Sequence, residues 1–172
     1  MANAMVSSLM LLAVAILPVT LDAQPQGELI ERTLAIVAGQ AITRADVQTA
    51  RALALVNAAD DTAAIERLVE RTLILREVER YAPPEPEEAA IEQRLRELRD
   101  RLGAQELPKL LSLGGFTEAR LRAWIRDDSR IASYLNQRFA IAGVGGQTRD
   151  DLIADWVADL RRRTPVVELW KK

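Results

Sequence analysis

Proline and glycine divide this chain into short segments, and within most of them apolar residues recur at helical spacing. The dividing residues are Pro83-Pro84, Gly103, Gly114-Gly115 and the glycine-rich stretch 143–146. Proline cannot continue the hydrogen-bond ladder of a helix, and glycine is common just past a helix end. The sequence therefore predicts a mostly helical fold.

The segment 85–102 shows the helical pattern most clearly. Ile91, Leu95, Leu98 and Leu102 follow one another at 3.5-residue spacing on an otherwise charged segment. A single narrow apolar seam predicts a helix that packs on one side and lies at the periphery of the domain. Periodicity and capping residues predict five more helices, at about 44–56, 61–81, 106–113, 117–139 and 148–163.

Two short β-leaning segments lie at opposite ends of the helical region. Leu34 to Val37, a turn at Gly39 and Ala41-Ile42 predict a small hairpin, and 165–170 predicts a final strand. A lone hairpin is only marginally stable. We therefore expect 34–37 and 166–169 to join in one small sheet, which gives a mostly α fold whose sheet joins the N-terminal hairpin to the C-terminal strand.

The first 23 residues differ from the rest of the chain. Residues 5–21 carry no charge, Pro18 interrupts them, and Ala23 precedes a polar start. This pattern is typical of a secretory signal peptide, and its apolar run is shorter than the roughly 20 residues that a spanning helix needs. We expect cleavage, location in the periplasm and no stable membrane insertion afterwards. Because no Lys or Arg precedes the apolar run, an uncleaved anchor and a wrongly assigned start codon are the alternatives.

The remaining residues, 24–172, are expected to form a single domain. Its core covers residues 30–140, a glycine-rich joint covers 141–147, and 148–172 supplies a completing helix and strand.

Composition excludes most catalytic chemistry. The 172 residues include no Cys and no His, which removes thiol nucleophiles, imidazole bases and the usual zinc sites. The balance of 23 Lys+Arg against 25 Asp+Glu offers no electrostatic footprint for nucleic acid. We therefore expect no catalytic residue, no metal and no cofactor.

Three adjacent aspartate pairs invite a catalytic interpretation: Asp60-Asp61, Asp127-Asp128 and Asp150-Asp151. Neighbours on a helix point about 100° apart, so these pairs cannot share a proton as a catalytic dyad does. We interpret them as helix caps and solvated faces. An enzyme that uses carboxylates alone is the weaker alternative.

Three stretches, in this order, resemble the N-terminal domain of the SurA-type periplasmic chaperones. Residues 34–47 resemble that family's pattern of strand, Asn/Gly turn, strand and Thr/Ser-x-x-Asp-Val/Leu, although Ala38 stands where the family often has Asn. Residues 64–77 resemble its Leu-Ile-Asp/Glu-x-x-Leu-Ile-x-x-Glu helix. Residues 114–122 are similar to its Gly-Leu/Phe-Thr/Ser-x-x-x-Leu-Arg helix start. The resemblance covers about residues 30–140.

The resemblance implies an ATP-independent chaperone that holds unfolded outer-membrane or secreted chains. Full-length members carry parvulin-type prolyl isomerase domains after the position of Phe139, where this chain has only the joint, one helix and one strand. We therefore expect no prolyl isomerase activity. The alternative is a non-catalytic dimerising or scaffold module of an envelope complex, with the helix at 86–102 contacting a second copy.

A client groove is expected along the short helix at 106–113 and the start of the long helix that follows it. Its lining residues would be Leu110, Leu113, Phe116, Leu121 and Trp124, with Gly114-Gly115 as a hinge between the two helices. Leucine and tryptophan at helical spacing are also ordinary core residues. Groove and core are therefore both open for each of the five positions.

Overall fold

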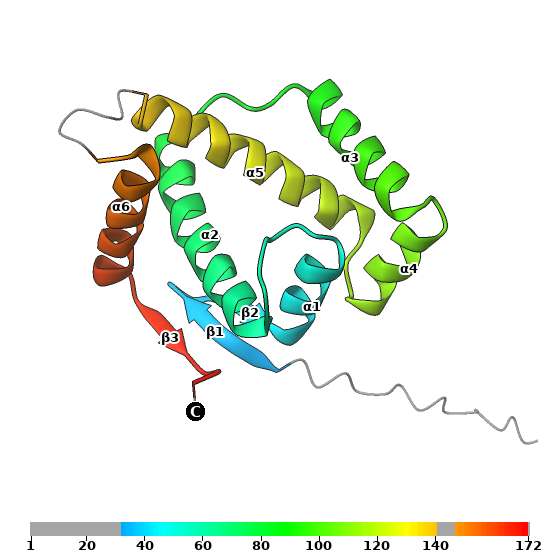
Figure 1. Cartoon of the computed structure of the whole chain (residues 1–172), viewed down its shortest axis with the longest axis horizontal. Coiled ribbons are helices and arrows are strands. Elements are labelled where there is room, and N and C mark those ends of the chain that lie inside the picture. The colour runs from blue at the N-terminus through cyan, green and yellow to red at the C-terminus, as the bar shows by residue number, and fades with distance from the viewer. Residues whose placement is uncertain (1–31, 141–146, 172) are drawn as a thin grey trace, which may run out of the picture.

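The computed structural model describes residues 32–140 and 147–171, and across them the chain forms a bundle of helices closed by a small sheet (Figure 1). The expected mostly α fold is confirmed. The expected signal peptide at 1–23 and nearly all of the glycine-rich joint lie outside the described residues. The elements are β1 (Thr33–Val37), β2 (Gln40–Thr43), α1 (Arg44–Ala52), α2 (Asp61–Tyr81), α3 (Glu88–Leu102), α4 (Glu106–Leu113), α5 (Glu118–Arg138), α6 (Arg149–Arg163) and β3 (Val166–Glu168).

The sheet joins the two ends of the described chain, as expected. Its strand order is β2-β1-β3, and both pairings are antiparallel. Ala35 lies opposite Glu168 in the register between β1 and β3. Ala38 and Gly39 form the hairpin turn with φ values of 47° and 91°. Positive φ at both central residues gives the turn type whose twist matches that of the flanking strands.

Two clusters of buried apolar side chains fill the molecule. The first lies among the sheet, α1, α2, α6 and the C-terminal half of α5. The second lies among α3, α4 and the N-terminal half of α5, with Leu53 from the end of α1. The helix α5 contributes to both, with Tyr134 in the first and Leu121 and Ile125 in the second. Figure 1 shows α5 as a long helix that crosses the molecule. Leu55 and Trp124 pack against both clusters and therefore connect them.

The helix expected over residues 44–56 is shorter than the sequence predicts, because α1 ends at Ala52. The N–H of Leu55 donates to the carbonyl of Ala50 at 2.7 Å, and the N–H of Ala54 donates to that of Arg51 at 3.0 Å. These bonds satisfy the last carbonyls of the helix in a Schellman motif, which requires a left-handed residue. Ala54 is this left-handed residue, with a φ of 49°, although glycine is the usual residue at such a position.

Replacing Ala54 by glycine should stabilise the protein. An L-residue pays a steric cost in the left-handed region that glycine does not, and the exposed Ala54 side chain buries little area. After the larger entropy of glycine in the unfolded chain is subtracted, the expected gain is about 0.5–1 kcal/mol. Urea unfolding of A54G and wild type measures the difference, and a loss of stability would contradict this account of how α1 ends.

Candidate functional site

The five positions expected to line a client groove do not lie in one groove. Phe116 and Leu121 are buried in the second cluster, with 4% and 0% of their surface exposed. Leu110 and Trp124 are half-buried at its edge. Leu113 is 78% exposed and faces solvent at the end of α4. Most of the predicted groove residues therefore pack inside the protein.

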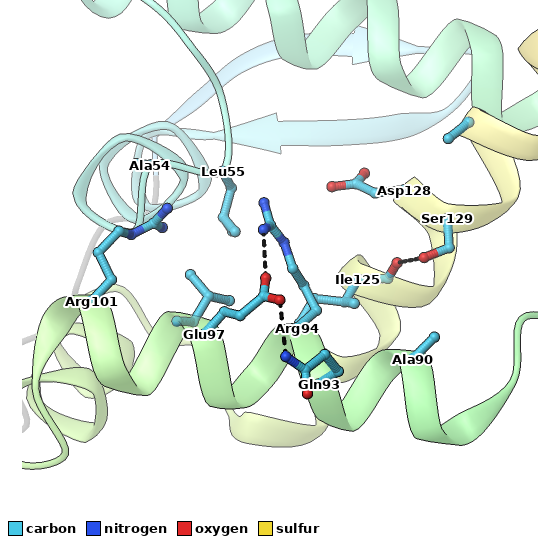
Figure 2. Close-up of a pocket in the computed structure, with 12 residues that line it drawn as sticks. Ala54, Leu55, Ala90, Gln93, Arg94, Glu97, Arg101, Ile125, Asp128 and Ser129 are labelled. Atoms are coloured by element: carbon cyan, nitrogen blue, oxygen red, sulfur yellow. Dashed lines mark hydrogen bonds and ion pairs between the residues drawn. The ribbon is translucent and has the colours of Figure 1, made fainter.

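The structure instead places two adjoining cavities along one side of α5. The first, of about 350 Å³, lies between α3, α5 and the segment after α1 (Figure 2). The second, of about 460 Å³, lies between α2, α5 and the same segment. Both are lined by Leu55, Asp128 and Ala132, so they meet at these residues. Together the two cavities are called the α5 groove below.

The lining of the α5 groove changes along its length. The second cavity is mainly apolar, and its apolar side chains are Leu55, Val56, Ile74, Ile131, Ala132 and Leu135. The first cavity combines Leu98 and Ile125 with the polar side chains of Gln93, Arg94 and Glu97. A third cavity of about 530 Å³, between α2 and α6, shares Ile74 with the second and continues the apolar surface. Such a surface suits an extended chain with mixed apolar and polar groups.

The charged side chains at the rim of the α5 groove are bonded within the protein. Arg94 donates to Glu97 at 2.9 Å, as the dashed line in Figure 2 shows. On α2, Arg67 donates to Glu70 at 2.9 Å. The rim therefore presents ion pairs rather than a field of one sign, and such exposed pairs add little to stability.

Arg71 connects α2 to α5 beneath the second cavity. Its guanidinium lies 3.9 Å from the centre of the Trp124 ring, and its Nη2 donates to the Trp124 carbonyl at 3.2 Å. Its Nε donates to Asp128 Oδ1 at 2.8 Å, and Asp127 Oδ2 lies 3.7 Å from Nη2. One cation therefore serves two neighbouring carboxylates, which gives the Asp127-Asp128 pair a structural role.

Burial raises the pKa of both Asp127 and Asp128 above the ordinary aspartate value, although the charge of Arg71 opposes the rise. The folded protein therefore binds protons at these carboxylates more tightly than the unfolded chain does. The contribution of the pair to the free energy of unfolding should then fall as pH rises through the window just above about 4, the unfolded pKa.

The double variant D127N/D128N tests this sign. Its free energy of unfolding is subtracted from that of wild type at several pH values between about 4 and 7, so that contributions from other groups cancel. We expect the free energy of unfolding of wild type to fall relative to that of the variant as pH rises. A constant difference would show that Arg71 cancels the effect of burial on the two pKa values, and a difference that moves in favour of wild type would show that Arg71 overcompensates burial.

Sequence reasoning missed the α5 groove for an identifiable reason. Val56 was expected inside a helix, and the segment that lines the groove exists only because α1 ends early, at Ala52. A signal was present in the run Leu73-Ile74-Leu75, because three consecutive apolar residues cannot share one helix face. Ile74 lies on a second face of α2 and lines the groove.

The apolar seam of α3 is used inside the chain. Ile91 and Leu95 are 0% exposed and Leu98 is 2% exposed, all within the second cluster. A ladder of ion pairs flanks the seam, in which Arg122 and Arg126 of α5 pair with acidic residues of α3 and the segment before it. In this conformation the seam is covered, so a second copy would have to displace α5 to reach it.

Residues 32–140 and 147–171 offer neither a cluster of metal-ligating side chains nor a helix suited to spanning a membrane. In this part of the chain, no group of three or more acidic, histidine or cysteine side chains is placed to hold a metal ion. Nor does any helix described here combine the length and apolarity needed to cross a bilayer.

Comparison with known proteins gives no match: neither a protein-family model nor a curated protein matches the chain. The resemblance to SurA-type chaperones therefore rests on its three sequence stretches. In the structure the first forms β1, β2 and the start of α1, the second lies in α2, and the third spans the α4–α5 junction.

Proposed function

We propose that the protein is an ATP-independent periplasmic chaperone that holds apolar segments of unfolded outer-membrane or secreted chains in the α5 groove. The observation that carries the proposal is the pair of adjoining cavities lined by apolar side chains and bordered by charges that already have partners. The sequence resemblance points to the same function. The signal-like segment at 1–23 supports location in the periplasm.

The energetics of such a groove suit reversible holding. Each Leu-sized client side chain that leaves water contributes about 1.5–3 kcal/mol. Ordering a flexible segment and losing its free motion cost part of this gain. A few contacts then give affinities on the order of micromolar, with rapid release and no need for nucleotide.

The proposal includes no catalysis, and therefore no prolyl isomerisation. The chain has neither His nor Cys, and the adjacent carboxylates of Asp127 and Asp128 both form ion pairs with Arg71. An assay of proline-peptide isomerisation should show no acceleration by the purified protein, and a clear acceleration would contradict this part of the proposal.

Filling the meeting point of the two cavities should weaken client binding. Ala132 is exposed and lines both cavities, so glutamine there projects a longer polar side chain into the α5 groove. We expect A132Q to weaken binding of an unfolded client about five- to tenfold, which corresponds to roughly 1–1.4 kcal/mol. Suppression of aggregation of a diluted, denatured outer-membrane protein measures the effect.

The matched control is A123Q, which makes the same substitution at an exposed position of the same helix that lines neither cavity. It should hold clients as wild type does. Glutamine is a good helix former, so both variants should keep the fold. Equal losses in the two variants, or no loss in A132Q, would place client binding elsewhere.

A further inference from the structure

Asp128 occupies a special position in the α5 groove. It is the charged residue that lines both cavities, and Figure 2 shows it on α5 across the first cavity from α3. Its side chain is 45% exposed, so its carboxylate still contacts water. Any segment that fills both cavities must pass over this carboxylate and remove that water.

The charge of Asp128 is only partly compensated within the protein. Arg71 is shared with Asp127. The next cation along α5, Arg130, approaches Asp127 only to 4.0 Å and lies closer to Glu85, at 3.4 Å. The raised pKa of Asp128 agrees with this geometry, because the nearby Arg71 and the Trp124 indole do not offset its burial.

Apart from Arg71, the cations that line the two cavities are engaged elsewhere. Arg94 pairs with Glu97, and Arg67 pairs with Glu70. Arg101 donates to the carbonyl of Leu53 at 2.8 Å. Beyond the bond from Arg71, these lining cations therefore do not replace the water that an occupant removes from Asp128, and leaving a carboxylate buried with too few donors is costly.

We propose that the α5 groove selects apolar segments that contain a lysine or arginine, with the cation placed against Asp128 and apolar neighbours in the two cavities. This inference rests on the proposed function and adds the chemistry of the preferred client. A client cation supplies the missing donor and a complementary charge. A glutamate at the same place would meet Asp128 with like charge, and a wholly apolar segment would cover the carboxylate without replacing its water.

Three fluorescent peptides of the same apolar sequence, with lysine, norleucine or glutamate at the centre, test the preference by fluorescence anisotropy. Wild type should bind the lysine peptide about tenfold more tightly than the glutamate peptide, with the norleucine peptide between them. In D128N the amide oxygen still accepts from Arg71, but the charge is gone, and the affinities of the three peptides should agree within about twofold. D128E should retain the preference for lysine.

The control D127N removes one charge from the same helix and from the same partner, Arg71, at a residue that lines neither cavity. It should retain more of the preference for lysine than D128N does, although Arg71 then serves Asp128 alone. Equal binding of all three peptides by wild type, or an equal loss of preference in D127N and D128N, overturns the selectivity while leaving groove binding intact. Absence of binding by all three peptides contradicts both the selectivity and the proposed function.

Discussion

Replacing Phe116 by alanine is expected to destabilise the protein by about 3–5 kcal/mol, the usual cost of truncating a buried phenylalanine. The Phe116 side chain is 4% exposed and packs in the second cluster, with its ring centre 6.2 Å from that of Trp124. Arg120 covers the ring from outside, with its guanidinium carbon 4.1 Å from the ring centre. Removing the ring leaves a cavity between α4 and α5 that neither helix can close without moving.

Leu113 provides the matched control, because the sequence favoured both residues equally as client contacts. Its side chain is 78% exposed, so L113A should change stability by less than about 0.5 kcal/mol. Thermal and urea unfolding of the two variants measure the contrast. If F116A were as stable as wild type, Phe116 would be a surface contact and the second cluster would be wrongly described.

Replacing Gly114 by alanine is expected to destabilise the protein by about 1–3 kcal/mol through overpacking. Gly114 ends α4 directly against α1. A Cβ at this position would overlap the hydroxyl of Thr49 and lie 2.9 Å from its Cβ. Thr49 is 2% exposed and cannot move aside without disturbing α1. Gly114 is therefore a close-packing position rather than the hinge that its sequence context suggests.

Two further variants separate packing from backbone effects. At Gly115 a Cβ would meet nothing within 4 Å, and its φ of 65° suits asparagine, so G115N should be nearly neutral. The Thr49 hydroxyl has no hydrogen-bond partner among the described residues, so T49A should cost little and should partly rescue G114A. A G114A protein that is as stable as wild type, or unchanged by T49A, would contradict the close approach of α4 to α1.

The fold could be predicted from the sequence because its signals are local. Pro83-Pro84 and Gly103 limit the helices as expected, and the capping box at Thr43 forms, with Asp46 accepting from the Thr43 N–H at 2.9 Å. Pairing of β1 with β3 followed from the instability of an isolated hairpin. The end of α1 was not predicted correctly, because the left-handed residue that ends it is Ala54, whereas glycine usually marks such a position in a sequence.

The site could not be predicted in the same way, because the same types of apolar residue line the groove and fill the core. Leu121 and Ile131 both belong to the apolar stripe of α5, yet one is buried in the second cluster and the other is half-buried beside a cavity. The difference depends on which elements lie opposite. The segment after α1 covers part of α5 and leaves the groove beside it, and that arrangement depends on tertiary packing rather than on periodicity.

The division into two clusters explains where the groove lies. Leu55 and Trp124 connect the clusters, and the α5 groove opens around Leu55, where neither cluster fills the space beside α5 completely. A client segment in the groove would therefore contact the boundary between the two packing units. The large stability cost of core variants such as F116A should be separable from the binding cost of groove variants such as A132Q.

Site-specific crosslinking measures client binding in the α5 groove most directly. The protein contains no cysteine, so A132C introduces a single thiol at the meeting point of the two cavities, and A123C introduces one on the same helix outside them. Each carries a thiol-linked photo-crosslinker and is illuminated with an unfolded outer-membrane protein. We predict efficient crosslinking from position 132, little from position 123, and competition at 132 by an unlabelled lysine-containing apolar peptide. Equal crosslinking from both positions, or none from 132 while aggregation is still suppressed, would contradict the assignment of the α5 groove as the client site.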